Sequence, residues 1–153
     1  MRKFIGISVL LAVCLGVSYA QEKKGKSLAL KDLPTAVQQT IQSELKGGEI
    51  KNISQEKENG VVQYEVESML NGKHRDMEVD NKGKLLVVEE ETAIDSIPAA
   101  AKAAILKKVG TGKLGMVENF MRGGETMYEA AYTTKAGKKL EVLVKADGTE
   151  TKD

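Results

Sequence analysis

The sequence predicts an α+β protein built from two tandem units, each with one helix packed on a four-stranded antiparallel sheet. A self-similarity at a spacing of 64 residues, which becomes 65 after one inserted residue, indicates the two units. In both copies an apolar pattern of period four precedes patterns of period two, which are typical of a helix and of half-buried strands. The first unit is predicted over residues 32–91 and the second over residues 95–153.

The two copies align from the first helix to the last hairpin turn. Residues 32–37 align with residues 96–101, including one proline in each, and Tyr64 aligns with Tyr128. The glycines of the later turns fall into register as well. Because glycines, a proline and a tyrosine coincide together with apolar positions, duplication explains the pattern better than chance.

Each copy is predicted to open with a helix. Asp32 and Ser96 are expected as N-caps, because their side-chain oxygens can accept hydrogen bonds from the first backbone N–H groups. Pro34 and Pro98 then fall in the first turn, where a missing N–H is tolerated. Apolar residues recur every four positions along one side of each helix: Leu33, Val37, Ile41 and Leu45, and then Ile97, Ala101, Ile105 and Val109.

Alternating side chains predict the strands that follow each helix. Val62, Tyr64 and Val66 alternate with polar residues, so one side of this strand is expected to face the helix. Glycine-containing stretches at 71–72 and 135–137 predict hairpin turns. A unit of about 60 residues buries only a modest part of its surface, so the two units are expected to share an interface or to join their sheets.

The N-terminal residues predict export. Arg2 and Lys3 precede an apolar stretch, and residues 18–20 supply small side chains at the two positions that a signal peptidase reads. We therefore expect a cleavable signal peptide over residues 1–20, a flexible leader over residues 21–31, and a periplasmic or secreted protein with no membrane contact after cleavage. An uncleaved N-terminal anchor is the alternative. The single cysteine, Cys14, lies inside the predicted signal peptide, so disulfides and thiolate chemistry are not expected in the mature chain.

The charge balance argues against two classes of partner. The whole chain has a formal net charge of +1, and removal of residues 1–20 takes away two basic residues and no acidic one. Acidic and basic residues are mixed along the remaining chain, as on a solvated surface. Such a chain offers no electrostatic reason to bind nucleic acid or an anionic membrane.

The sequence contains no recognisable catalytic set. His74 is the only histidine, and no serine lies in a nucleophile-elbow sequence. We therefore predict a protein that is not an enzyme and that carries no cofactor. His74, Asp76 and Glu78 alternate along one strand and are weak candidates for metal ligands; the alternative is the polar side of a one-faced antiparallel sheet.

The second copy has apolar residues where the first copy has polar ones. Met127, Ala131 and Leu143 are predicted on the sheet face that the helix does not cover. An uncovered apolar patch usually marks a contact surface, so these residues are the candidate partner-binding site. Packing of the two units against each other at this patch is the alternative interpretation.

The helix starts at Leu33-Pro34 and Ile97-Pro98, the Tyr64-Glu65-Val66 and Tyr128-Glu129-Ala130 strands and the glycine turns resemble PepSY-like domains. A pair of such units after a signal peptide is similar to β-lactamase-inhibitor-like proteins that bacteria export. This resemblance implies a non-catalytic binding module for another exported protein, acting as an inhibitor or a chaperone-like partner. A periplasmic protein that binds or senses a small ligand or a metal is the alternative function.

Overall fold

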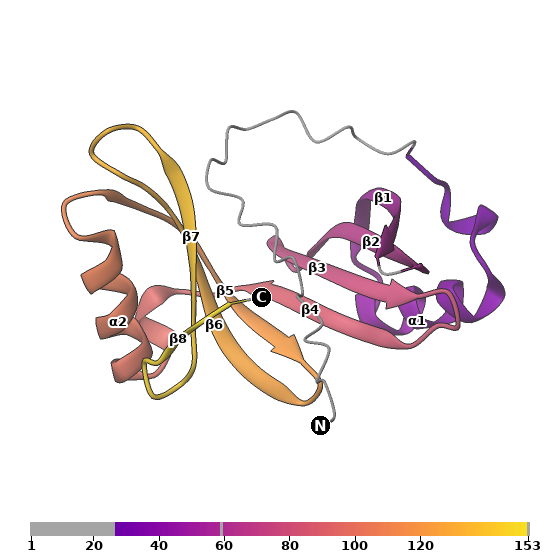
Figure 1. Cartoon of the computed structure of the whole chain (residues 1–153). Coiled ribbons are helices and arrows are strands. Elements are labelled where there is room, and N and C mark those ends of the chain that lie inside the picture. Colours follow the sequence, from indigo (N-terminus) through magenta and orange to yellow (C-terminus); the bar gives the residue numbers. More distant parts are fainter. Residues whose placement is uncertain (1–26, 59, 153) are drawn as a thin grey trace, which may run out of the picture.

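In the computed structural model, which describes residues 27–58 and 60–152, all strands belong to one antiparallel sheet of eight strands. The strands lie in the sheet in the order in which they occur in the sequence, so every neighbouring pair is consecutive (Figure 1). The two α-helices are α1 (Thr35–Leu45) and α2 (Ala99–Val109). The strands are β1 (Glu49–Glu58), β2 (Val61–Leu70), β3 (Lys73–Asp80), β4 (Leu85–Glu91), β5 (Lys113–Arg122), β6 (Glu125–Thr133), β7 (Lys139–Val144) and β8 (Glu150–Thr151).

The prediction of two units that each have a four-stranded sheet of their own is wrong. The last strand of the first predicted unit, β4, pairs with the first strand of the second, β5, over residues 87–91 and 118–122. Just after β4, the backbone N–H of Thr92 donates to the carbonyl oxygen of Val117 over 2.8 Å. Because strand edges carry unpaired backbone groups, joining β4 to β5 satisfies groups that two separate sheets would expose. The fold is therefore a single sheet with two helices.

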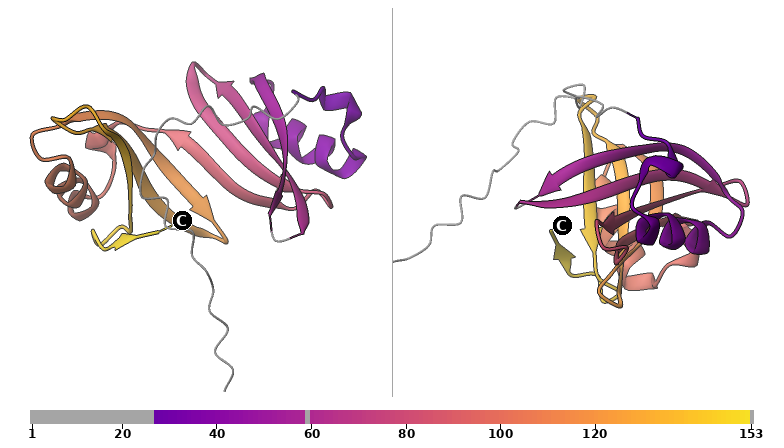
Figure 2. Two further views of the ribbon diagram at one scale, coloured as in Figure 1. Left: turned by 45° about the horizontal axis from the view of Figure 1, so that its top comes forward. Right: turned by 90° about the vertical axis from the view of Figure 1, so that its right-hand side faces the viewer.

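Both helices pack on the same face of this sheet. Val88 of β4 belongs to the core under α1, and its register partner Met121 on β5 packs against that core. Val117 lies four positions before Met121, on the same side of β5, and it belongs to the core under α2. One face of the sheet thus carries both cores, with the helices near its two ends (Figures 1 and 2).

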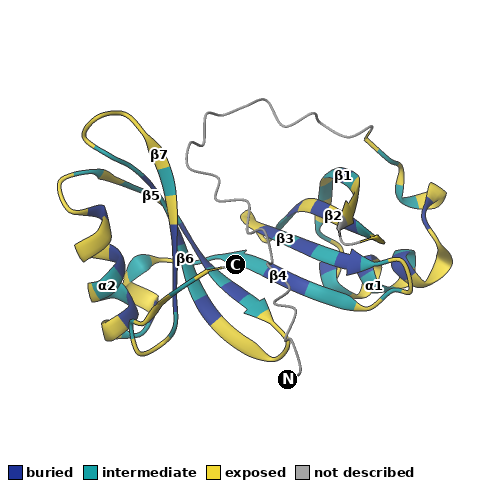
Figure 3. Ribbon diagram, viewed as in Figure 1, coloured by how far each residue is buried: buried dark blue, intermediate teal, exposed yellow. Residues whose placement is uncertain are grey.

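The sheet is strongly twisted between the two helices. The right-hand view of Figure 2 shows the strands of the first half crossing those of the second half at a steep angle. Antiparallel sheets twist because each strand has a right-handed twist of its own, which accumulates over many strands. The alternation of buried and exposed residues along the strands follows this one-sided packing (Figure 3). Neither helix in residues 27–58 and 60–152 has the length and apolar character that a membrane span requires.

The helices begin later than their predicted N-caps. Asp32 and Ser96 lie in short 3-10 helices, Leu30–Asp32 and Ile94–Ser96, and the helices proper start after Pro34 and Pro98. A proline disfavours helical backbone at the residue before it, and Leu33 is accordingly extended, with ψ of 161°. The N-cap prediction was wrong for this reason. The predicted apolar stripes of both helices are buried, and each helix ends at a residue with positive φ.

The predicted signal peptide and the first part of the predicted leader lie outside the described residues. In the remainder of the leader, Leu28 donates its backbone N–H to the carbonyl oxygen of Ile53 on β1 over 2.9 Å. Leu28 and Leu30 also pack against the core under α1.

The turn between β3 and β4 lies unusually close to α1. Gly83 has a φ of +85°, and a Cβ atom added there would lie 2.7 Å from the carbonyl oxygen of Ala36 in the first turn of the helix. The carbonyl oxygen of Gly83 accepts a hydrogen bond of 2.6 Å from the Thr40 hydroxyl. Gly148, in the turn before β8, lies as close to α2: a Cβ atom added there would be 2.8 Å from the carbonyl oxygen of Ala100. Only glycine fits at this contact, since it has no Cβ and accepts a positive φ.

We expect Gly83→Ala to destabilise the protein by about 2–4 kcal/mol, because the methyl group is strained by the positive φ and also overlaps the helix backbone. Gly72→Ala is the matched control: Gly72 has a φ of +79° but open space around it, so about 1 kcal/mol is expected from backbone strain alone. Urea unfolding of both variants measures the difference. Equal losses at the two positions would show that the close contact with α1 contributes nothing.

Candidate functional site

The sheet face opposite both helices is the candidate functional site. We call it the open face. By register it carries mainly polar and charged side chains on β2 and β3, and both charged and apolar side chains on β4, β5, β6 and β7. These residues are Gln63, Glu65, Glu67, His74, Asp76, Glu78, Val87, Glu89, Glu91, Glu118, Phe120, Arg122, Met127, Glu129, Ala131, Lys139, Glu141 and Leu143.

The apolar residues of the open face form a small core of their own. Val87 of β4, Phe120 of β5, Met127 of β6 and Leu143 of β7 pack together, with Leu86 against them. We call this group the apolar strip. The guanidinium carbon of Arg122 lies 4.9 Å from the centre of the Phe120 ring, within the range of a cation–π contact. The strip thus joins β4 from the first half of the chain to three strands of the second half.

The predicted partner-binding residues lie where the sequence placed them, on the face without helices. Two of them are more buried than an uncovered patch would be: Met127 is 9% exposed and Leu143 is 5% exposed. Ala131 is half-buried and lies opposite the exposed Glu141 of β7. The accessible part of this region is therefore Ala131 and its charged neighbours rather than the strip itself.

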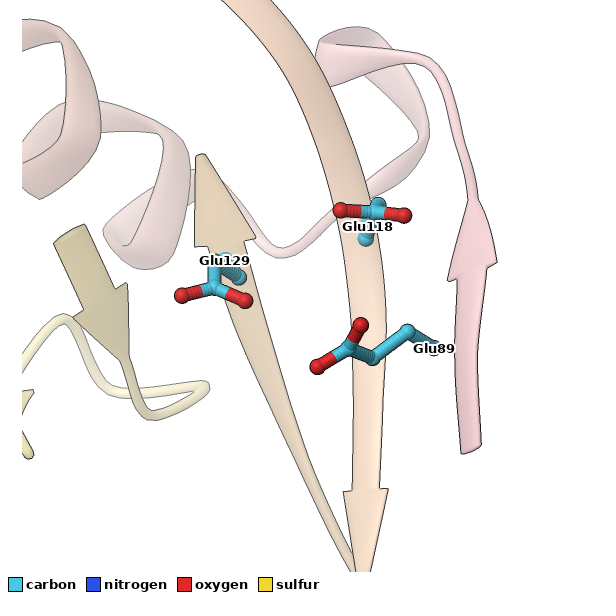
Figure 4. A group of neighbouring side chains, drawn as sticks. All are labelled: Glu89, Glu118 and Glu129. Atoms are coloured by element: carbon cyan, nitrogen blue, oxygen red, sulfur yellow. The ribbon is translucent and has the colours of Figure 1, made fainter. Parts of the chain in front are cut away.

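Three glutamates converge beside the apolar strip. Glu118 of β5 and Glu129 of β6 are register partners, and Glu89 of β4 lies on the same face. One carboxylate oxygen from each of the three lies within 4.8 Å of the other two. Figure 4 shows the Glu89 side chain reaching from β4 across β5 toward the other two carboxylates. We call these residues the carboxylate cluster.

The cluster is electrostatically unfavourable when all its members are ionised. Burial, followed by repulsion from the carboxylates of Glu129 and Glu118, raises the pKa of Glu89 to about 8. Burial also raises the pKa of Glu118, and the nearby Asp76 adds to this effect. The cluster is therefore a place where a proton, a cation or a basic side chain is bound favourably.

The predicted metal ligands His74, Asp76 and Glu78 lie on the open face, along β3. They do not form the carboxylate cluster. Among the residues that the structure describes, the cluster consists of Glu89, Glu118 and Glu129. The carboxylate of Asp76 accepts a hydrogen bond of 2.9 Å from the backbone N–H of Ser68. Sequence reasoning missed the convergent residues, because Glu89 and Glu118 come together only when β4 pairs with β5.

Comparisons with known proteins show a shared fold. No protein-family model matches the chain, and no curated protein matches it. A protein of Bacteroides eggerthii described as periplasmic has a TM-score of 0.63 at 14% identity, over 78% of this chain and 86% of that one. A DUF2874 family protein of Bacteroides ovatus has a TM-score of 0.60 at 12% identity, over 78% of this chain and 85% of that one. A BLIP-like protein of Bacteroides fragilis has a TM-score of 0.57 at 17% identity, over 78% of this chain and 84% of that one. The chain therefore has a BLIP-like fold, and this likeness extends to the fold alone.

We expect the unfolding free energy to fall as the pH rises from about 4.5 to about 8 in metal-free buffer. The unfolded chain loses the Glu89 proton near pH 4.5, whereas the folded protein keeps it until its raised pKa near 8, so rising pH favours the unfolded state within this window. The charged groups that raise the pKa of Glu89 are Glu129, Glu118, Asp76 and Glu78, all of them acidic. Glu89→Gln should flatten this dependence and stabilise the protein at pH 8 by about 1–3 kcal/mol, after allowance for solvent screening.

Urea unfolding of wild type and Glu89→Gln across this pH range measures the effect. Glu56→Gln, an exposed position on β1, is the control and should keep the wild-type pH dependence. A wild-type stability that rises between pH 5 and pH 8, or a Glu89→Gln curve parallel to it, would contradict the expectation.

Leu143→Glu is expected to lower the unfolding free energy by about 3 kcal/mol or more, because it buries a carboxylate among Val87, Phe120 and Met127. Val61→Glu makes the same chemical change at a side chain that is 51% exposed, and it should change stability by less than about 0.5 kcal/mol. Chemical denaturation of both variants is the test. Near-equal stabilities would mean that the apolar strip is not a packed core.

Proposed function

We propose that this protein is an exported, non-catalytic binding module that holds another exported protein against the open face of its sheet. The observation that carries the proposal is the asymmetry of the sheet. Both α-helices of residues 27–58 and 60–152 pack on one face, while the other face presents converging carboxylates beside an apolar strip. Through this binding the protein would act either as an inhibitor of its partner or as a chaperone-like module.

The charges of the open face indicate what kind of partner fits. Acidic residues on this face outnumber basic ones, and they lie on β2, β3, β4, β5, β6 and β7. Complementary charge steers association and selects partners, so the partner is expected to present lysine and arginine side chains. The half-buried Ala131 and the partly buried Leu86 offer apolar contact within this acidic surface. An apolar side chain surrounded by basic residues is the complementary arrangement on the partner.

Export supports an extracytoplasmic partner. The predicted signal peptide over residues 1–20 agrees with the description of a structural neighbour as periplasmic. The assignment of the chain to PepSY-like domains stays a prediction. The proposal rests on the surface of the sheet and does not need that assignment.

The proposal is tested with a matched pair of substitutions. Ala131→Arg adds bulk and positive charge to the open face, whereas Ala103→Arg adds the same side chain to the exposed side of α2. The wild-type chain is used to capture partners from the exported fraction of the producing cell, and the affinity of each purified partner is then measured. We expect Ala131→Arg to weaken the binding at least about tenfold and Ala103→Arg to leave it unchanged.

Salt provides the second readout. Binding that depends on complementary charge should weaken as the ionic strength rises. The proposal fails if Ala103→Arg disrupts binding while Ala131→Arg does not, or if the partner binds as well at high salt as at low salt. Circular dichroism of both variants excludes misfolding as the cause of any loss.

A further inference from the structure

The carboxylate cluster brings acidic oxygens from three neighbouring strands to one point. Register alone places Glu118 directly opposite Glu129, and Glu89 reaches this pair from β4 (Figure 4). One oxygen from each residue lies within 4.8 Å of the others. The cluster therefore has the donor atoms of a cation site.

A second observation is independent of this convergence. Glu118 is only 9% exposed, and its Oε1 atom is buried without a hydrogen-bond partner. A buried polar atom without a partner costs about 1–3 kcal/mol, and more when it is charged, so native proteins rarely leave one. The Glu118 side chain stands on the same face of the sheet as those of Glu89 and Glu129, and one of its oxygens lies within 4.8 Å of an oxygen from each of them (Figure 4). A ligand with positive charge would satisfy this oxygen.

We propose that Glu89, Glu118 and Glu129 bind a divalent cation, and that this cation is calcium. The site lies on the open face beside the apolar strip, and it does not include His74, Asp76 or Glu78 as primary ligands. The inference stands apart from the proposed partner protein, because a cation site can be measured on the purified chain alone.

The donor atoms and their spacing favour calcium over other divalent ions. All three ligands are carboxylate oxygens, which suit calcium and magnesium, whereas zinc prefers sites with nitrogen or sulfur. Two oxygens on opposite sides of a calcium ion lie about 4.6–5.2 Å apart, because calcium–oxygen distances are about 2.3–2.6 Å. Around magnesium the same separation is only about 4.0–4.2 Å. The three glutamate oxygens all lie within 4.8 Å of one another, so they fall within the span of one calcium shell. Magnesium demands near-ideal octahedral geometry and usually keeps several waters, whereas the flexible shell of calcium accepts three carboxylates from neighbouring strands more readily.

The surroundings leave room for the remaining ligands. Calcium takes about six to eight oxygens, so carboxylates that bind through both oxygens and water molecules must complete the shell. A small hollow of about 70 Å³ adjoins Glu89, which is enough for a few waters at roughly 10–15 Å³ each. Its other lining residues are Glu65, Asp76, Met77, Glu78 and Val87, so acidic side chains face these waters. Neither Glu118 nor Glu129 lines the hollow, so it provides space for water on the Glu89 side of the cluster.

Isothermal titration of the purified protein with calcium chloride, after removal of metals by a chelator, tests the inference. We expect one ion per chain with a dissociation constant of about 10⁻⁴ to 10⁻³ M, the range of calcium sites in extracellular modules. Magnesium should bind at least about tenfold more weakly. Calcium should also raise the thermal unfolding midpoint, since it binds the folded state.

Glu118→Gln should weaken calcium binding at least about tenfold while the protein stays folded, because a neutral amide keeps the shape and relieves the repulsion. Glu129→Gln serves as a second variant with the same expectation. Glu67→Gln removes a charge from an exposed position on β2 of the same face and should leave the affinity within about twofold. The inference is overturned if calcium gives neither heat nor thermal stabilisation, if Glu118→Gln and Glu129→Gln bind like wild type, or if Glu67→Gln loses as much affinity as they do.

Discussion

Strands β4 and β5 pair over residues 87–91 and 118–122, and the rest of the structure depends on this pairing. It joins strands β1–β4, which pack on α1, and strands β5–β8, which pack on α2, into one sheet. It also sets which side chains meet on the open face. Val87 reaches Phe120 only because β4 lies beside β5, and Glu89 reaches Glu118 for the same reason. Without this pairing the protein would have two helix-covered cores but neither the apolar strip nor the carboxylate cluster.

The pairing also explains why one face is crowded and the other is not. Both helices approach the sheet from the same side, because Val117 and Met121 project from the same side of β5 and serve the two different cores. The contacts of each helix with its turn, at Gly83 for α1 and at Gly148 for α2, hold this arrangement. Because side chains alternate between the two faces along each strand, every second residue projects from the open face instead. Since antiparallel sheets can expose one face to water, such a face is free to carry charged groups.

The sequence was sufficient for features that depend on local periodicity. The buried side of α1, with Val37 and Ile41, and the alternation around Tyr64 and Val66 both follow from the spacing of apolar residues. Placing Leu143 on the face without helices followed from the same alternation. The β4–β5 pairing could not be predicted in this way, because the register between two strands separated by a helix leaves no local pattern in either. The carboxylate cluster was missed with it: Glu89 and Glu118 are unremarkable until their strands are neighbours.

The open face combines two features that affect each other. The apolar strip beside Glu89 and Glu118 excludes water, which makes repulsion among the carboxylates stronger and their attraction for a cation stronger as well. A bound calcium ion would cancel two negative charges at the centre of the acidic face. A partner that is recognised through basic residues would then bind less well, and by reciprocity that partner would weaken the binding of the ion. The two proposed ligands of this face are therefore expected to compete, because the same desolvated carboxylates attract both.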